Sequence, residues 1–196
     1  MADLDAIFKA YDVRGTTPDQ LDEPTARAIG AAFARFAQQQ PGGATRVLVG
    51  RDMRESGVGL AAAFADGVLG QGLDVVELGL CSTDLIYFAA GSLDAPAVML
   101  TASHNPAQYN GMKMCLAGAK PVGEDTGLRE IKALAAEGLP EAASRGTRTE
   151  QDLLGAFADH VRSFVDPSVL RPLKVVADTA NGMGGLVVPA VFEGLP

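Results

Sequence analysis

A single serine lies where it could carry a phosphoryl group. It belongs to the hexapeptide Thr-Ala-Ser-His-Asn-Pro at 101–106, which follows the apolar run 97–100. That run predicts a buried strand, so Ser103 should lie just beyond the carboxyl end of a strand. Open α/β sheets bind their ligands at this edge. A phosphoryl group on Ser103 would add about −1.5 to −2 charges, which nearby cations would have to neutralise.

Two other interpretations of Ser103 compete with this one. A hydrolase nucleophile would be expected in a Gly-x-Ser-x-Gly turn or beside a histidine and an aspartate from separate elements. His104 follows directly, and adjacent side chains of an extended segment point to opposite faces. In the third interpretation Ser103 and Asn105 are ordinary turn residues and Pro106 closes the strand. The sequence around Ser103 has neither hydrolase pattern. The hexapeptide alone does not decide whether Ser103 is an ordinary turn residue or a phosphoryl carrier.

Two basic residues beside turn glycines are the best cation candidates. Arg14 ends the short extended segment 11–14 and can offer a planar fork to phosphate oxygens. Lys113 belongs to a segment that we expect to begin with a tight Asn110-Gly111 turn and to continue as a strand. A lysine there could act as a point charge or transfer a proton.

These segments together resemble the α-D-phosphohexomutase family, whose members move a phosphoryl group between the 1- and 6-hydroxyls of a hexose. The resemblance is carried, in order, by Phe-Lys-Ala-Tyr-Asp-Val-Arg-Gly at 8–15, Gly-Arg-Asp-Met-Arg at 50–54, the hexapeptide 101–106, Asn-Gly-Met-Lys at 110–113, and Asp-Thr-Ala-Asn-Gly-Met-Gly-Gly at 178–185. The aromatic-Asp-Val-Arg-Gly opening is similar to the phosphomannomutase/phosphoglucomutase branch.

The resemblance implies a role for each matching residue. Ser103 would be the phosphoserine that donates to a sugar phosphate and is rephosphorylated by a hexose 1,6-bisphosphate. Arg14 and Lys113 would flank it and bind phosphate, with Lys113 as a proton-transfer group. Asn105 would also bind phosphate, and His104 would support the active site. Mg²⁺ would bind through the phosphate on Ser103.

The resemblance also implies what this chain would lack. The family's Asp-x-Asp-x-Asp metal loop, its sugar-selecting residues and its distal phosphate site come from later domains, and none of these motifs is found here. The expected substrates are the 1- and 6-phosphates of mannose or glucose and the 1,6-bisphosphate. We therefore expect an N-terminal fragment that is inactive alone. The alternatives are a non-catalytic sugar-phosphate-binding or regulatory remnant and a phosphoglucosamine mutase.

Composition narrows the class of partner. A net charge of −8 argues against nucleic acid or an anionic membrane as the main partner, because both need a basic surface. Cys81 and Cys115 lie too far apart in sequence for a metal knuckle, and we expect both to be reduced and buried. The N-terminus carries Asp3 and Asp5 and no apolar run, so we expect a cytoplasmic protein.

The pattern of strands and helices predicts an α/β fold with a mixed, mostly parallel sheet sandwiched between helices. Strands are expected at 11–14, 46–50, 74–78, 97–100 and 110–114, and helices at 24–40, 56–69, 82–90 and 125–136. The strand at 110 follows its predecessor after a short loop and should run antiparallel to it. Ser82 and Ser56 are expected to cap their helices, and Arg51 and Asp52 to hold the neighbouring loop.

The C-terminal quarter is expected to begin a second, similar α/β domain that is incomplete. We place the first domain at 1–146 and the linker helix and first strand and helix of the second at 147–196, with the polar stretch 141–148 as the linker. A helix is expected at 151–165, with His160 at its surface, and a strand at 174–177. The glycine turn near 182 is a weak match to nucleotide-binding loops, so Asp178 and Asn181 are expected to shape the turn and cap the next helix. Because a lone strand and helix cannot bury their apolar faces, this tail should dock loosely or self-associate.

Overall fold

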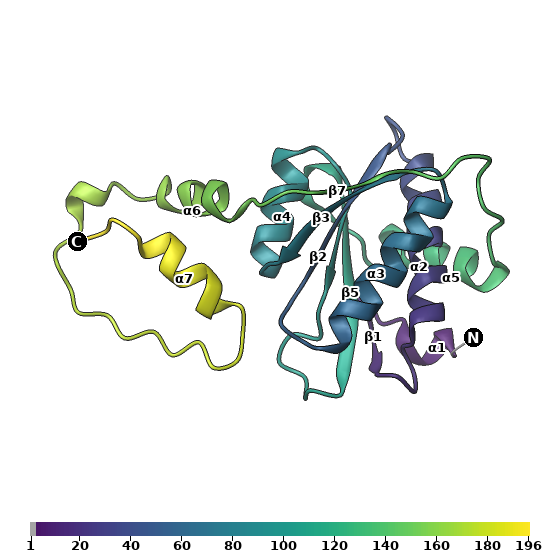
Figure 1. The fold of residues 1–196 in the computed structure, drawn as a ribbon, viewed down its shortest axis with the longest axis horizontal. Helices are drawn as coiled ribbons and strands as arrows, with labels where there is room; N and C mark the ends of the chain where they lie inside the picture. Colours follow the sequence, from purple (N-terminus) through teal and green to yellow (C-terminus); the bar gives the residue numbers. More distant parts are fainter. Residues whose placement is uncertain (1–2) are drawn as a thin grey trace.

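Seven strands form one mixed sheet in the computed structural model, which describes residues 3–196 (Figure 1). The strands are β1 (Val13–Thr16), β2 (Arg46–Arg51), β3 (Asp74–Leu80), β4 (Ala97–Leu100), β5 (Tyr109–Leu116), β6 (Lys120–Pro121) and β7 (Arg148–Glu150). The α-helices are α1 (Leu4–Ile7), α2 (Glu23–Gln39), α3 (Ser56–Gly70), α4 (Thr83–Ser92), α5 (Leu128–Glu137), α6 (Leu154–Arg162) and α7 (Gly184–Phe192). Short 3₁₀ turns lie at Ala117–Ala119, Glu124–Thr126 and Pro167–Val169.

The sheet has the order β1-β5-β4-β2-β3-β7, with β6 paired to β5. The strands β4, β2, β3 and β7 are mutually parallel, and β5 runs antiparallel to β4, β1 and β6. Only β5 is therefore reversed within this sheet. The prediction of a mixed, mostly parallel sheet is confirmed, as is the antiparallel strand that follows the Ser103 loop.

Helices cover both faces of the sheet. The helices α2, α3 and α5 pack on one face around Phe33, Phe64 and Met112, which are fully buried. The other face is covered by α4 and the start of α6, around Ile86 and Phe157. Figure 1 shows α4 on one side of the sheet and α2, α3 and α5 on the other. Strand ends between two helical layers are held rigidly, and this is what the Ser103 loop requires.

Helix ends follow the local capping residues closely. Ser82 accepts a hydrogen bond from the amide of Leu85 at 3.2 Å, as predicted, and Asp22 does the same for Thr25 at the start of α2. The helix predicted from 125 begins only at Leu128, because Gly127 has φ of +144°, which is not a helical conformation. Ser56 was expected to be an N-cap, but it is the first residue of α3 and makes no capping bond. Its hydroxyl instead accepts from the Asn110 amide at 2.9 Å.

The expected Asn110-Gly111 turn is wrong, because both residues lie inside β5 and are buried. Gly111 stands opposite Arg14, and a Cβ there would collide with the carbonyl oxygen of Val13. The glycine therefore permits close approach of β1 to β5 and forms no turn.

The stretch predicted to be a linker is bound to the first domain. Ala142 donates to the Gly70 carbonyl and Gly146 to that of Leu69, at 2.8 and 2.9 Å. Strand β7 follows and extends the sheet just beyond the predicted boundary at 146. The strand expected at 174–177 is not formed within residues 3–196, because no neighbouring strand is there to pair with it. No helix in this range is both long and apolar enough to cross a bilayer.

Candidate active site

Ser103 lies in an exposed turn at the carboxyl edge of the sheet. Its φ of +53° places it in the left-handed region, which serine adopts uncommonly. The loop begins as a continuation of the sheet, since the Thr101 amide donates to the Gly111 carbonyl of β5 at 3.0 Å. The serine hydroxyl is therefore accessible, while the backbone that carries it is anchored.

Arg14 reaches the Ser103 loop from β1. Its Nη1 donates to Asn105 Oδ1 at 2.7 Å, and its Nη2 pairs with Asp12 Oδ2 at 2.5 Å. Its Nε is buried and has no hydrogen-bond partner among residues 3–196. The structure thus brings Arg14 and Asn105 together as predicted. Asp12, which lies just before β1 and two residues before Arg14, was not expected to take part in the site.

Lys113 lies on the same face of the sheet as Arg14. Arg14 pairs with Gly111, and Lys113 follows two residues later on β5, opposite Met99 of β4. The side chain is half-buried, and no hydrogen bond or ion pair joins it to Ser103 or Arg14 in the described chain. The fold therefore places Lys113 near the site without a direct contact to the serine.

His104 lies closer to Ser103 than expected from an extended segment. The left-handed conformation at Ser103 turns the chain, and the Ser103 hydroxyl lies 3.4 Å from His104 Nδ1. This oxygen–nitrogen separation is longer than the roughly 2.5–3.2 Å of a strong hydrogen bond. The expectation of opposite faces is thus wrong, but the pair does not form a tight nucleophile and base.

A buried polar chain supports the loop from below. Because β2 and β4 are parallel neighbours with Arg51 opposite Leu100, the residues that follow, Asp52 and Thr101, lie side by side. Thr101 Oγ1 donates to Asp52 Oδ2 at 2.6 Å and accepts from the Ser103 amide at 2.9 Å. The expected role of Asp52 in holding the loop is confirmed.

Arg54 also supports the Ser103 loop, a role that was not expected from the sequence. It pairs with Asp52 through Nε at 3.2 Å and donates to backbone carbonyls of the 103–109 loop. The side chains of Arg54 and Asp52 are only 7% and 6% exposed, respectively. The signal was present, since Arg54 closes the Gly-Arg-Asp-Met-Arg motif, but one arginine in a motif does not show that it is buried. Arg51, expected to share this role, donates only to the Asp52 carbonyl at 3.2 Å.

The cysteines take no part in the site. Cys81 and Cys115 are free and buried, as predicted. Burial raises the pKa of Cys81 to about 12 and that of Cys115 to about 11. Both therefore stay as thiols near neutral pH.

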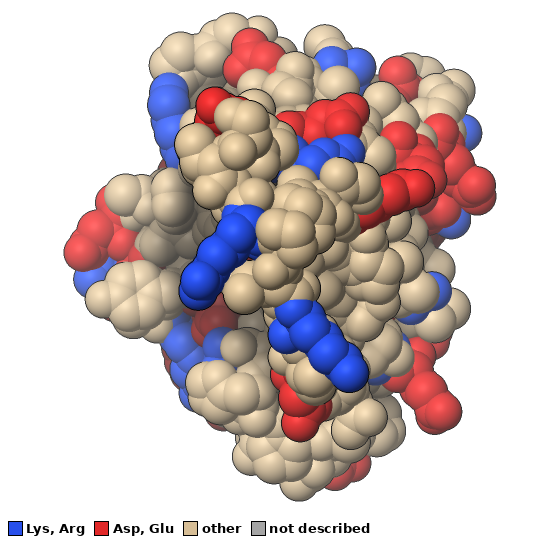
Figure 2. Space-filling view, turned by 90° about the vertical axis from the view of Figure 1, so that its left-hand side faces the viewer, with Lys and Arg blue, Asp and Glu red and all other residues tan. Residues whose placement is uncertain are grey.

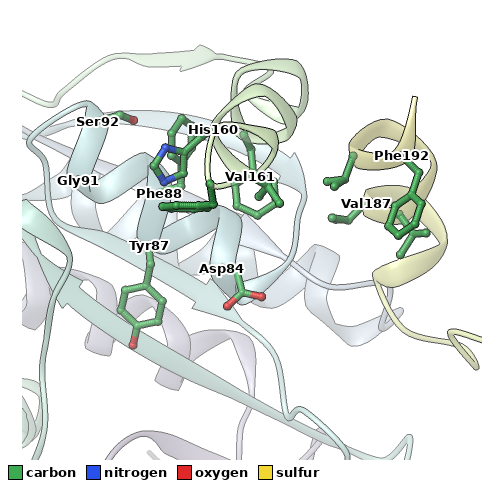
Figure 3. A pocket seen from close by; sticks show the side chains of 13 residues that line it. Asp84, Tyr87, Phe88, Gly91, Ser92, His160, Val161, Val187 and Phe192 are labelled. Carbon is green, nitrogen blue, oxygen red and sulfur yellow. The ribbon is translucent and has the colours of Figure 1, made fainter. Parts of the chain in front are cut away.

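An apolar cavity lies elsewhere, between α4, α6 and α7 (Figure 3). Its volume is about 820 Å³, and its lining is mainly aromatic and aliphatic, with Phe88, Phe157 and Val187 among the residues. His160, expected at the surface, is exposed there and packs against Phe88 in a tilted arrangement and against Phe164 edge-to-face, with ring centroids 4.9 Å apart in each pair. None of the predicted site residues lines this cavity.

Asp178 shapes the glycine turn before α7, as predicted. The Asp178 carboxylate accepts from the Ala180 amide at 3.0 Å, while Asn181 makes no capping bond to α7. The cap expected of Asn181 is therefore wrong.

The chain is similar to known proteins of one family. The family model described as phosphoglucomutase/phosphomannomutase, alpha/beta/alpha domain I, matches residues 5–141. The chain belongs to the phosphoglucomutase/phosphomannomutase family. Arg14, Ser103 and Lys113 all fall inside the matched range of this domain I.

Individual relatives of the phosphoglucomutase/phosphomannomutase family agree over nearly the whole chain. A protein named phosphohexose mutases from Xanthomonas campestris pv. campestris is 42% identical over 195 residues, which cover 96% of this chain and 42% of the relative. A phosphomannomutase from Vibrio cholerae is 38% identical, covering 92% and 40%. The crystal structure of a phosphoglucomutase/phosphomannomutase family protein from Burkholderia thailandensis matches with a TM-score of 0.87 at 34% identity, over 100% of this chain and 43% of that one. The chain thus spans about two fifths of the length of these relatives.

The described residues do not supply a metal site of the kind that the family resemblance implies. Mg²⁺ prefers several oxygen ligands in octahedral geometry. No group of three or more His, Cys, Asp or Glu side chains lies close enough together in residues 3–196 to hold a metal ion. Ser103 alone does not fit that ligand set, so no chemical step is assigned here to a metal.

Proposed function

We propose that this chain is the phosphoserine-bearing domain of a phosphomannomutase or phosphoglucomutase, which interconverts hexose 1-phosphate and hexose 6-phosphate through a hexose 1,6-bisphosphate. One observation carries the proposal: Ser103 is exposed on a left-handed turn at the carboxyl edge of the sheet, and Arg14 is bonded to the same loop. The family membership and the names of the relatives support the same activity.

The proposed reaction moves one phosphoryl group at a time. The bond between Ser103 Oγ and phosphorus breaks, a sugar hydroxyl oxygen bonds to phosphorus, and the hydroxyl proton passes to Ser103 Oγ. The second half reverses these changes at the other phosphate of the bisphosphate. Lys113, on the face shared with Arg14, is proposed to pass the proton.

Local cations would hold the anionic substrate in spite of the net charge of −8. The Arg14 side chain is 29% exposed, and each of its Nη atoms carries a second N–H beyond the one used by Asn105 or Asp12, so it retains donors for a phosphate. We propose Mg²⁺ as the cofactor of the whole enzyme and a cytoplasmic location, and we propose that the 196-residue chain alone is inactive.

The test is turnover by the full-length protein. Mannose 1-phosphate and glucose 1-phosphate are supplied separately, with magnesium and a trace of the matching 1,6-bisphosphate, and formation of the 6-phosphate is followed. We expect Ser103→Ala to lower the rate by at least about a thousandfold, because it removes the covalent carrier. Ser92→Ala on α4 is the matched control and should keep the wild-type rate. A wild-type protein inactive on both sugars, or an active Ser103→Ala variant, would contradict the proposal.

A further inference from the structure

Arg54 uses every hydrogen-bond donor of its guanidinium. Nη1 donates to the carbonyls of Pro106 and Tyr109, both at 2.9 Å, and Nη2 donates to those of Ser103 and Asn105, at 2.8 and 2.7 Å. Nε donates to Asp52. Arginine has five N–H donors, and all five have acceptors here. Three of the acceptors are carbonyls of the loop that contains Ser103 and a fourth is the carbonyl of Tyr109, the first residue of β5, so the backbone around Ser103 supplies most of the partners that this buried guanidinium needs.

These contacts and those of Thr101 close a ring around the backbone of Ser103. The Ser103 amide donates to Thr101, Thr101 donates to Asp52, Asp52 pairs with Arg54, and Arg54 returns to the Ser103 carbonyl. Serine in the left-handed region costs about 1–2 kcal/mol unless its surroundings hold it there. Both peptide groups of Ser103 are fixed by this ring, so its left-handed conformation is imposed by the network.

The inward carbonyls also set the direction of the amides. In a trans peptide the N–H points opposite to the C=O of the same group. Since the Ser103 and Pro106 carbonyls point to the buried Arg54, the amides of His104 and Ala107 point away from it, toward the exposed side of the loop. Neither amide donates to any acceptor within residues 3–196. These two amides are three residues apart, and each leaves an N–H on the exposed side of the loop that can donate to an anionic oxygen.

We propose that Arg54 is the positioning residue of the phosphoryl carrier: it holds Ser103 in the left-handed turn and directs the His104 amide toward the phosphoryl group on Ser103. This inference rests on the proposed function. Arg54 is buried and all five of its donors are used within the protein, so none is left for a sugar, and its removal should disturb the transfer step and leave sugar binding nearly unchanged.

The test compares arginine variants of the full-length protein. Arg54→Met removes all five donors, and Arg54→Lys keeps the charge but loses the planar fork. Arg46→Met is the matched control, since Arg46 lies at the opposite end of β2 and donates only to the Leu93 carbonyl. We expect Arg54→Met to lower kcat by at least about tenfold, because misplacing a reacting group by 1 Å costs up to a hundredfold. The KM of Arg54→Met should change by less than about threefold. The kcat of Arg54→Lys should lie between those of wild type and Arg54→Met, and Arg46→Met should have the wild-type kcat and KM.

Hydrogen exchange of the loop supplies a second readout that does not need turnover. We expect exchange at 103–109 to accelerate in both Arg54 variants and not in Arg46→Met, while exchange in β2 and β4 stays as in wild type. A fall in kcat that only follows the folded fraction, or unchanged loop exchange, would overturn the proposal. A wild-type protein without mutase activity would refute the proposed function instead, and the exchange result would still decide whether Arg54 holds the loop.

Discussion

The hydroxyl of Thr101 links the Ser103 backbone to the buried carboxylate of Asp52. Thr101→Val keeps the shape of the side chain but leaves Asp52 without this donor and the Ser103 amide without its acceptor. We expect a loss of about 1–3 kcal/mol in the free energy of unfolding, measured by urea denaturation. Thr101→Ser keeps the hydroxyl and should lose less. Equal stabilities of the valine and serine variants would show that the hydrogen bonds contribute nothing.

The buried thiols predict a pH dependence of stability. Their pKa values in the fold, about 12 for Cys81 and about 11 for Cys115, lie above the ordinary 9.0 because burial disfavours the thiolate. The folded state therefore binds these protons more tightly than the unfolded state. Their contribution is full below about pH 9 and is lost as the pH rises through 11 to 12.

Urea denaturation at pH 8 and pH 10.5 tests whether the free energy of unfolding falls as the pH rises. The wild-type free energy of unfolding should fall more between the two values than that of the Cys81→Ala, Cys115→Ala double variant. The double variant is the control for lysine and tyrosine titration. The same pH dependence in both proteins would exclude the thiols as its source.

At the scale of elements, the approach of β1 to β5 depends on a residue without a side chain. Gly111→Ala would place a Cβ against the Val13 carbonyl and separate Arg14 from the Ser103 loop. We expect destabilisation by about 1–3 kcal/mol, since an overpacked site has to shift its backbone. Gly91→Ala on α4 meets no atom within 4 Å and should leave the stability unchanged or raise it by up to about 1 kcal/mol, because alanine favours a helix. Thermal unfolding of the two variants makes the comparison.

The sequence predicted the elements whose signals are local. Apolar runs and helical periodicity located β2 to β5 and α2 to α4 within a few residues, and Ser82 capped α4 as expected. The errors came from tertiary contacts. Gly111 has the sequence of a turn but serves a close strand approach, and Ser56 bonds Asn110 instead of its own helix. Strand β7 was missed because three polar residues show no alternation, and only the edge of β3 makes them a strand.

The residues at the surface of the site could be predicted from the sequence, but the arrangement of the buried residues that support them could not. Residue type and motif indicated Ser103, Arg14 and Asn105, and the structure brings Arg14 and Asn105 into contact. Asp52 and Arg54 stand two residues apart, yet their importance comes from the parallel pairing of β2 with β4, which places the ends of both strands at one loop. Sequence spacing alone does not show which strands are neighbours.

At the scale of the whole molecule, the C-terminal segment after α6 is poorly covered. Phe164 is 72% exposed and Val176 is 88% exposed. The side that carries α6 and α7 faces the viewer in Figure 2, where uncharged residues cover much of the surface and basic side chains stand out among them. The helix α7 has no fully buried residue and is tied to α6 by Arg162, which donates to the carbonyls of Ala190 and Val191.

This exposure predicts uneven stability in the 196-residue chain. Amides at 164–196 should exchange with solvent faster than those of β2 and β4, because few apolar contacts protect them. Mass spectrometry after hydrogen exchange measures this, and sedimentation velocity determines whether the chain is monomeric or associates through the exposed surface. A tail as well protected as the sheet, in a demonstrated monomer, would contradict the prediction.

Peptide mapping of the full-length protein shows whether Ser103 carries the phosphoryl group. The dephosphorylated protein is incubated with hexose 1,6-bisphosphate and magnesium, digested and analysed by mass spectrometry. We predict one phosphate on the peptide that contains Ser103, and none on that peptide in the Ser103→Ala variant. Phosphate on another residue, or an unlabelled Ser103 in a protein that shows mutase activity, would show that Ser103 is not the phosphoryl carrier.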